Sequence, residues 1–181
     1  TDGDFNSVQS IEVVESSLPL RVESYGIREN SCGDGKNRGG FGMRRCIRVL
    51  SDSASLSILS DRNVIPPYGV LGGAYGAPNR FAVRRNDQEI KPSEHPGKVA
   101  GFALHEGDVV VMETAGGGGY GDPLEREPGR VLKDVSLGYL SAAEALRRYG
   151  VAISKDGTVD PELTRKKRDE IKSSRVLLPL Q

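Results

Sequence analysis

The segment of residues 114–123, TAGGGGYGDP, combines four successive glycines with a tyrosine, a further glycine and an Asp-Pro pair. Unshielded glycine N–H groups can hold an anion or a carbonyl oxygen. The segment formally contains G-x-G-x-x-G at Gly116, Gly118 and Gly121, but Pro123 follows at once, and a dinucleotide site also needs a second strand after the helix. A Walker loop is excluded because no Lys-Ser/Thr pair follows. Two interpretations remain: a binding loop, or a strand-to-helix connection packed against a neighbour.

Three arginines could also bind an anion. Arg38 precedes a glycine pair, and Arg44 and Arg45 lie in the strand pattern that follows. A guanidinium group binds carboxylate or phosphate through two parallel hydrogen bonds. The alternative for such residues is a structural ion pair, for example with Glu23 or Asp61.

Histidine and cysteine are sparse. His95 and His105 lie farther apart than the histidines of local metal motifs, so both are expected at the surface. Cys32 and Cys46 are expected as reduced thiols, because a domain of this size needs no disulfide and nothing indicates secretion. Neither cysteine has a helper group nearby in the sequence, and G-x-S-x-G is absent. The residues alone therefore give no self-contained catalytic set.

Composition favours a loop-rich, β-rich body, since 23 of the 181 residues are glycine without a collagen-like period. Lys plus Arg and Asp plus Glu both number 25, so charge predicts neither a nucleic acid nor an anionic membrane as partner. No apolar run approaches the roughly 20 residues that span a bilayer. We expect a soluble, cytoplasmic protein. The start, TDGDFNSVQS, lacks an initiator Met and a signal-peptide pattern, which indicates a processed chain or a piece of a longer one.

Alternating apolar residues predict several strands, and three consecutive valines at 109–111 predict burial on both faces of one of them. Residues 1–19 are expected to be irregular apart from a short element around IEVVE. The expected strands cover 20–28, 41–50, 53–60, a hairpin over 80–91 that turns at Asn86-Asp87, and 98–114 with a turn at Glu106-Gly107.

The end of the chain has helix signals. Asp122-Pro123 predicts a helix start, and Ser141 with Glu144 predicts a capping box for a helix ended by Gly150. Asp160-Pro161 opens a charged helix that is expected to be a solvated arm. The fold class is therefore α+β, with a mainly β body over about 20–115 followed by short helices. We divide it into a glycine-rich β body, 1–121, and a helical segment of the same domain, 122–181.

Five segments, taken in order, resemble the C-terminal part of the hydantoinase B/oxoprolinase family. The resemblance covers about residues 6–158. It departs from the family at two places. Ala115 stands where the family usually has proline, and HPGK replaces its usual SK, so that Lys98 is the lysine that remains. The segments are LPLRVESYGIRENSCGDGKNRGGFGMRR, LSDR, PPYGVLGGAYGAPN, LHEGDVVVMETAGGGGYGDPLEREP and DVSLGYLSAAEALRRYGV.

Members of that family are B-type subunits, or B-type halves, of ATP-dependent enzymes. These enzymes open cyclic amides such as hydantoins and 5-oxoproline, or carboxylate ketones such as acetone and acetophenone. The resemblance implies that an A-type partner binds ATP and magnesium and phosphorylates the substrate, and that the B-type part acts on the phosphorylated intermediate. It implies a divalent metal, Mn or Zn, in the N-terminal part of the B-type subunit, so this chain alone is expected to bind no cofactor or metal and to be inactive.

The implied partners are that N-terminal part and the A-type subunit, in a hetero-oligomer. An oxyanionic intermediate is stabilised by N–H groups and guanidinium groups that need no reorganisation. The alternative is a non-catalytic structural or assembly module, and the sequence does not separate hydrolase from carboxylase. The candidate contacts with substrate or intermediate are Arg38, Arg44, Arg62, Gly116, Gly117, Gly118, Gly119 and Tyr120.

Overall fold

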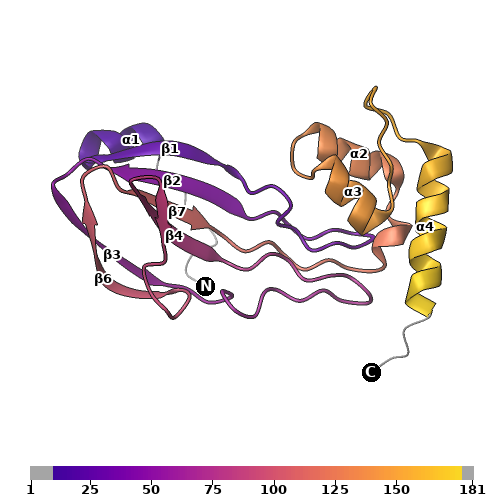
Figure 1. Cartoon of the computed structure of the whole chain (residues 1–181), viewed down its shortest axis with the longest axis horizontal. Coiled ribbons are helices and arrows are strands. Elements are labelled where there is room, and N and C mark those ends of the chain that lie inside the picture. Colours follow the sequence, from indigo (N-terminus) through magenta and orange to yellow (C-terminus); the bar gives the residue numbers. More distant parts are fainter. Residues whose placement is uncertain (1–9, 177–181) are drawn as a thin grey trace. The chain divides into compact units, whose positions relative to one another are not determined.

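In a computed structural model, the described part of the chain is residues 10–176, and it contains seven strands and four α-helices (Figure 1). This confirms the α+β class. The strands are β1 Leu20–Ile27, β2 Met43–Val49, β3 Ser53–Leu59, β4 Arg80–Arg85, β5 Gln88–Ile90, β6 Lys98–His105 and β7 Val109–Glu113. The helices are α1 Ile11–Ser17, the 3-10 helix η1 Pro123–Glu125, α2 Pro128–Ser136, α3 Ala142–Tyr149 and α4 Pro161–Val176.

The described residues form two compact units that alternate along the chain. The expected division of one domain at residue 121 stays a prediction. Unit 1 contains the described residues up to Gly26, together with Arg44–Asp61 and Arg80–Glu113. Unit 2 contains Ile27–Met43, Arg62–Asn79 and the described residues from Thr114 onward.

Unit 1 consists of a five-stranded sheet in the order β1-β2-β7-β4-β5 and a two-stranded sheet of β3 and β6. Strand β7 pairs antiparallel with β2 on one side and β4 on the other, which sets Val111 opposite both Cys46 and Ala82. The expected β strands are therefore present. The short element expected around IEVVE is helix α1, capped by Ser10. Residues 1–9 of the expected irregular start lie outside the described residues.

The core of unit 1 lies on both faces of β7. Val110 packs with Val49, Val83 and Leu104 on one face, while Val109 and Val111 pack with Cys46 and Ala82 on the other. All three valines are buried, as their sequence run predicted. Each fully buried valine contributes about 1.5–3 kcal/mol of hydrophobic stabilisation.

The β4–β5 hairpin turns where the sequence predicted. Asn86 and Asp87 have φ values of 50° and 61°, so both central residues are left-handed. Such a two-residue turn matches the right-handed twist of the strands that it joins. Asn and Asp tolerate this conformation better than other residues that carry a side chain.

The helix expected to start at Asp122-Pro123 is interrupted. The Asp122 carboxylate accepts the N–H of Leu124 as predicted, but only the three residues of η1 follow. A second proline, Pro128, holds Glu127 outside the helical region, at φ −59° and ψ 127°, because the residue before a proline avoids that region. The Glu127 carboxylate then caps α2 by accepting the N–H groups of Gly129 and Arg130.

The predicted ends of α3 are confirmed. Ser141 Oγ accepts the N–H of Glu144 at 3.2 Å, and Gly150 ends the helix with φ 61°. The reciprocal half of the capping box is not formed, since the Ser141 N–H donates to Asn30 Oδ1 at 3.0 Å. This bond joins two segments that are far apart in the sequence.

The expectation of α4 as a solvated arm is wrong for one face of that helix. Thr164 is buried, and its Oγ accepts the N–H of Ala152 at 3.0 Å. Arg168 donates to the carbonyl oxygens of Tyr149 at 3.1 Å and Arg126 at 2.6 Å. The hydropathy pattern gives no sign of this attachment, because α4 is held through hydrogen bonds to backbone carbonyl oxygens. None of the helices in residues 10–176 is both long enough and apolar enough to cross a membrane.

Candidate functional site

The glycine loop 116–121 lies in unit 2 beside two other glycine-rich segments, 31–42 and 67–77, and we call these three segments the glycine bundle. These segments do not form a regular β-sheet, but their backbones are hydrogen-bonded directly to one another. Gly33 N–H donates to Gly117 O at 2.8 Å, and Ala74 N–H donates to Asp34 O at 2.7 Å. The bundle is therefore a backbone-to-backbone core.

Three glycines of the loop fit because they lack a side chain. A Cβ on Gly116 would lie 1.8 Å from Ser31 O, one on Gly118 1.8 Å from Tyr68 O, and one on Gly119 1.8 Å from Asp34 O. Real Cβ atoms do not approach backbone oxygens so closely, so any side chain here would force the segments apart. Glycine is required for packing, whatever else the loop does.

Most N–H groups of the loop already have backbone acceptors. Gly116 donates to Ala77 O at 3.0 Å, Gly117 to Gly40 O at 2.9 Å and Gly119 to Ala74 O at 2.9 Å. Tyr120 donates to Asn37 O and Gly121 to Val70 O. These donors hold the bundle together. A contact between Gly116–Gly119 and an intermediate stays a prediction.

Arg38 is engaged by a buried acid of α2. Its Nε and Nη2 donate to the two carboxylate oxygens of Asp134 at 2.9 and 3.1 Å, and its guanidinium carbon lies 4.2 Å above the ring of Phe41. Asp134 is 5% exposed and also accepts from Arg126 at 3.0 Å. A buried carboxylate shared by two guanidinium groups is typical of a structural ion pair.

The other predicted contacts lie in separate places. Arg44 belongs to β2 of unit 1, with Nε 3.6 Å from a carboxylate oxygen of Glu113. Arg62 of unit 2 is exposed and has φ 58°, and its carbonyl accepts the N–H of Asn79. Tyr120 is 50% exposed. Within unit 2 the structure does not bring Arg38 and Arg62 into one bonded cluster with the loop.

The cysteines and histidines lie as expected. Cys32 and Cys46 are both free and buried, and His95 and His105 are exposed. Burial, helped by the negative charge of Asp34, raises the pKa of the Cys32 thiol. A thiol with a raised pKa stays protonated at neutral pH and is a poor nucleophile.

A small cavity in unit 2, which the sequence analysis missed, gathers polar groups beside the glycine bundle. It has a volume of about 260 Å³ and is lined by Cys32 and Asp34 of the first segment, Tyr75–Ala77 of the second, and Arg147 and Arg148 of α3, with Asn30. We call it the Asp34 pocket. Its acid, Asp34, and its arginine Arg148 lie 114 residues apart in the chain, so no local spacing in the sequence points to the pocket.

Asp34 and Arg148 form the inner wall of the Asp34 pocket. Arg148 Nη1 lies 3.1 Å from the Asp34 carboxylate and also donates to Cys32 O, while Nη2 donates to Asn30 O. Burial outweighs this partner and raises the pKa of Asp34 above its usual range. A carboxyl group with a raised pKa is better suited to accept and release a proton near neutral pH.

Arg147 forms the outer wall. Its side chain is 67% exposed and is held by Glu144, with Nε–Oε1 at 2.9 Å and Nη2–Oε2 at 2.6 Å. Arg148 also donates to Glu144. These hydrogen bonds, from Arg147 first, lower the pKa of Glu144 from 4.5 to about 2. The pocket therefore combines an exposed guanidinium, which can attract an anionic oxygen, with a carboxyl group whose pKa is raised by burial.

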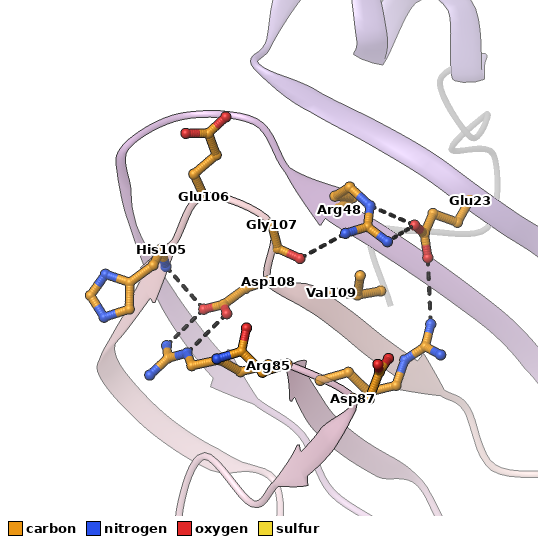
Figure 2. Close-up of a pocket in the computed structure, with 11 residues that line it drawn as sticks. Glu23, Arg48, Arg85, Asp87, His105, Glu106, Gly107, Asp108 and Val109 are labelled. Atoms are coloured by element: carbon orange, nitrogen blue, oxygen red, sulfur yellow. Dashed lines mark hydrogen bonds and ion pairs between the residues drawn. The ribbon is translucent and has the colours of Figure 1, made fainter.

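A larger cavity, of about 570 Å³, lies in unit 1 (Figure 2). Figure 2 shows the Asp108 carboxylate facing Arg85, with N–O distances of 2.9 and 2.7 Å, and accepting the backbone N–H of His105. The hydrogen bond from Arg85 holds the pKa of Asp108 below its usual range. On the other side, Glu23 binds Arg48 and Arg84. These pairs fix the Glu106-Gly107 turn, so we interpret the charges of this cavity as structural.

The known proteins that resemble this chain identify its class. The sequence model described as hydantoinase B/oxoprolinase matches residues 4–123. The chain belongs to the hydantoinase B/oxoprolinase family, as the resemblance of its motifs indicated.

Individual relatives are more specific. An uncharacterized protein of Methanocaldococcus jannaschii is 43% identical over 161 residues, which cover 87% of this chain and 28% of that protein. The B-type subunit of a putative D-/L-hydantoinase from a Pseudomonas species, strain NS671, is 36% identical over 158 residues, which cover 87% of this chain and 26% of that protein. A nucleotide-free acetone carboxylase, solved in work on ATP-dependent acetone carboxylation, superposes with a TM-score of 0.79 at 25% identity and covers 97% of this chain and 28% of that one. The chain thus spans little more than a quarter of the length of each of these proteins.

We expect Gly118→Ala to destabilise the chain by at least about 3 kcal/mol, because the new methyl group would overlap Tyr68 O. Urea unfolding followed by circular dichroism measures the loss. Gly40→Ala is the matched control, since a Cβ at Gly40 meets nothing within 4 Å. Equal stability of the two variants would show that the bundle is not packed as described.

We also expect the free-energy difference between the wild-type chain and Glu144→Gln to depend on pH. The pKa of Glu144 is lowered on folding, so its stabilisation is complete above the unfolded value of 4.5 and disappears as pH falls through about 2. Urea unfolding at pH 6, 4 and 3 should show the wild-type advantage shrinking stepwise. An advantage that is the same at pH 6 and pH 3 contradicts the Arg147–Glu144 pairing.

Proposed function

We propose that this chain is the C-terminal part of a B-type subunit of an ATP-dependent cyclic-amide hydrolase, of the hydantoinase or 5-oxoprolinase type, or of a ketone carboxylase, of the acetone or acetophenone type. The observation that carries the proposal is the family match over residues 4–123. The hydantoinase relative and the acetone carboxylase described above support the two chemistries. In the assembled hetero-oligomer, an A-type partner would bind ATP and magnesium and phosphorylate the substrate, and the B-type subunit would act on that intermediate.

Within this proposal the Asp34 pocket is where this chain would meet the intermediate. Arg147 would attract a phosphate or an oxyanion, because its guanidinium is exposed and placed by Glu144. Asp34 would hold or release the proton that accompanies ring opening or carbon–carbon bond formation, supported by its raised pKa and its place in the pocket wall. Arg148 would position Asp34.

The contacts predicted from the sequence remain proposals. Arg62 and Tyr120 have exposed side chains that could reach a ligand. Arg38, Arg44 and most of the glycines 116–119 already bond to other groups of the chain. They would contact an intermediate only through donors that these partners do not occupy.

The family also implies a divalent metal, Mn or Zn. Among residues 10–176, no group of three or more His, Cys, Asp or Glu side chains is placed to hold a metal ion. We therefore propose that the residues of the remaining B-type subunit would supply that site.

A second candidate function is that of a non-catalytic structural or assembly module of the same complex. It is favoured by the use of the loop N–H groups within the glycine bundle and by the ion pair of Arg38 with Asp134. Under this alternative no side chain of the chain touches the substrate.

An assay of the complete complex separates the two chemistries. We expect ATP-dependent loss of hydantoin, 5-oxoproline, acetone or acetophenone, followed by chromatography with and without bicarbonate. Consumption that requires bicarbonate indicates a carboxylase, since carbon dioxide must be added to the enolate, and consumption without it indicates a cyclic-amide hydrolase. Absence of nucleotide-dependent loss of all four compounds contradicts the proposed function.

An isosteric substitution separates catalysis from assembly. In the complete complex, Asp34→Asn should lower kcat by about 100-fold, as expected for loss of a general acid or base. The amide keeps an oxygen for Arg148, so the complex should still assemble on size-exclusion chromatography. Asp156→Asn, on the exposed loop before α4, is the matched control. Wild-type kcat in an intact Asp34→Asn complex would favour the assembly module.

A further inference from the structure

Residues 63–79 of unit 2 form a segment without a single Asp, Glu, Lys or Arg, although 28% of the chain is charged. Apolar and aromatic side chains of this segment point to solvent, together with that of Tyr120, which bridges to Val70. We call this surface the apolar loop face. Its members, each between 45% and 74% exposed, are Val64, Ile65, Tyr68, Val70, Leu71, Tyr75 and Tyr120.

The apolar loop face is held rigidly from behind by the glycine bundle. Val70 N–H donates to Gly119 O at 2.9 Å, and Gly121 N–H donates to Val70 O at 3.0 Å. A Cβ on Gly73 would lie 2.1 Å from Gly119 O, so the two backbones are in direct contact at this point. The exposed side chains are therefore presented by a fixed backbone, which lowers the conformational entropy lost on binding.

Six large apolar side chains on one uncharged loop, with Tyr120 beside them, are unusual for a surface that stays in water. Exposed apolar area costs about 25 cal/mol per Å² relative to its burial, and contiguous apolar patches mark interaction sites. Permanent interfaces are more apolar than transient ones, and their buried cores are depleted of charge. The composition of residues 63–79 fits a permanent interface.

The length of the relatives indicates what covers this face. The chain spans 28% and 26% of the two curated relatives, so nearly three quarters of a subunit of that kind lies outside these 181 residues. We infer that the apolar loop face packs permanently against the remainder of the B-type subunit. The inference rests on the proposed function, since it takes this chain to be part of such a subunit.

Photo-crosslinking in the assembled enzyme tests the contact. Tyr68 is replaced by benzoylphenylalanine, an aromatic side chain that fits its exposed position, and the same replacement at Tyr25 on β1 of unit 1 is the matched control. After irradiation, mass spectrometry is expected to find crosslinks from position 68 to segments of the B-type subunit outside these 181 residues. Crosslinks to a second copy of the chain, crosslinks to the A-type subunit, or none from position 68 would each overturn the inference.

A charge placed on the face gives an independent measurement. Ile65→Lys should reduce the yield of assembled enzyme on size-exclusion chromatography at least about tenfold, because a lysine would be buried in an apolar interface. Leu59→Lys, at the 85% exposed leucine of β3 in unit 1, is the matched control and should assemble normally. Normal assembly of Ile65→Lys overturns the inference. The ATP-dependent assay tests the proposed function separately. An active enzyme without these crosslinks contradicts only the packing of the apolar loop face. An inactive enzyme with these crosslinks contradicts only the proposed function.

Discussion

The close approach of three backbones in the glycine bundle is the constraint on which unit 2 depends. Ser31 O, Tyr68 O and Asp34 O occupy the space where side chains of Gly116, Gly118 and Gly119 would stand. A core of this kind gains little from the hydrophobic effect and is held by backbone hydrogen bonds and dispersion. It also carries the entropic cost of ordering glycine, which loses more freedom on folding than any other residue. The packed helices then add an apolar cluster of Val131, Leu140, Ala145, Tyr149 and Val151.

Because the close contacts of the bundle are made by glycine backbones, most of the side chains that could carry chemistry in unit 2 lie at its margin. Arg148 shows how that margin is fixed: its guanidinium donates to the carboxylates of Asp34 and Glu144 and to the carbonyls of Cys32 and Asn30. One side chain of α3 thus sets the path of the first glycine segment. Asp34 keeps its place through both its carboxylate and its carbonyl, which accepts from Ala74. A proton-carrying group is most useful when held this firmly.

The sequence predicted the parts whose signals are local. The valines of β7, the Asn86-Asp87 turn and the caps of α3 depend on neighbours within a few residues, and the structure contains all three. A connection packed against a neighbour was one of the two interpretations of residues 116–121. The segments against which it packs were not predicted, because backbone-to-backbone packing imposes no periodic side-chain pattern. The sign of this packing in the sequence is the clustering of glycine in residues 31–42, 67–77 and 116–121.

Long-range partners were equally hidden. Arg38 and Asp134 are 96 residues apart, and nothing in either local sequence selects the other. The same holds for the Asp34 pocket, whose acid and base come from opposite ends of unit 2 in the sequence. An anion-binding arginine and a structural one look alike until the buried acid beside them is known, since both rely on the same bidentate geometry. Burial of the acid separates the two kinds of arginine. Asp134 is only 5% exposed, so a ligand that replaced it as the partner of Arg38 would leave its charge unpaired in the interior. Arg147 is 67% exposed and can bind an anion while it keeps its hydrogen bonds to Glu144. Arg147, and not the arginine marked by neighbouring glycines, is therefore the better candidate for recognising the phosphorylated intermediate of the proposed function.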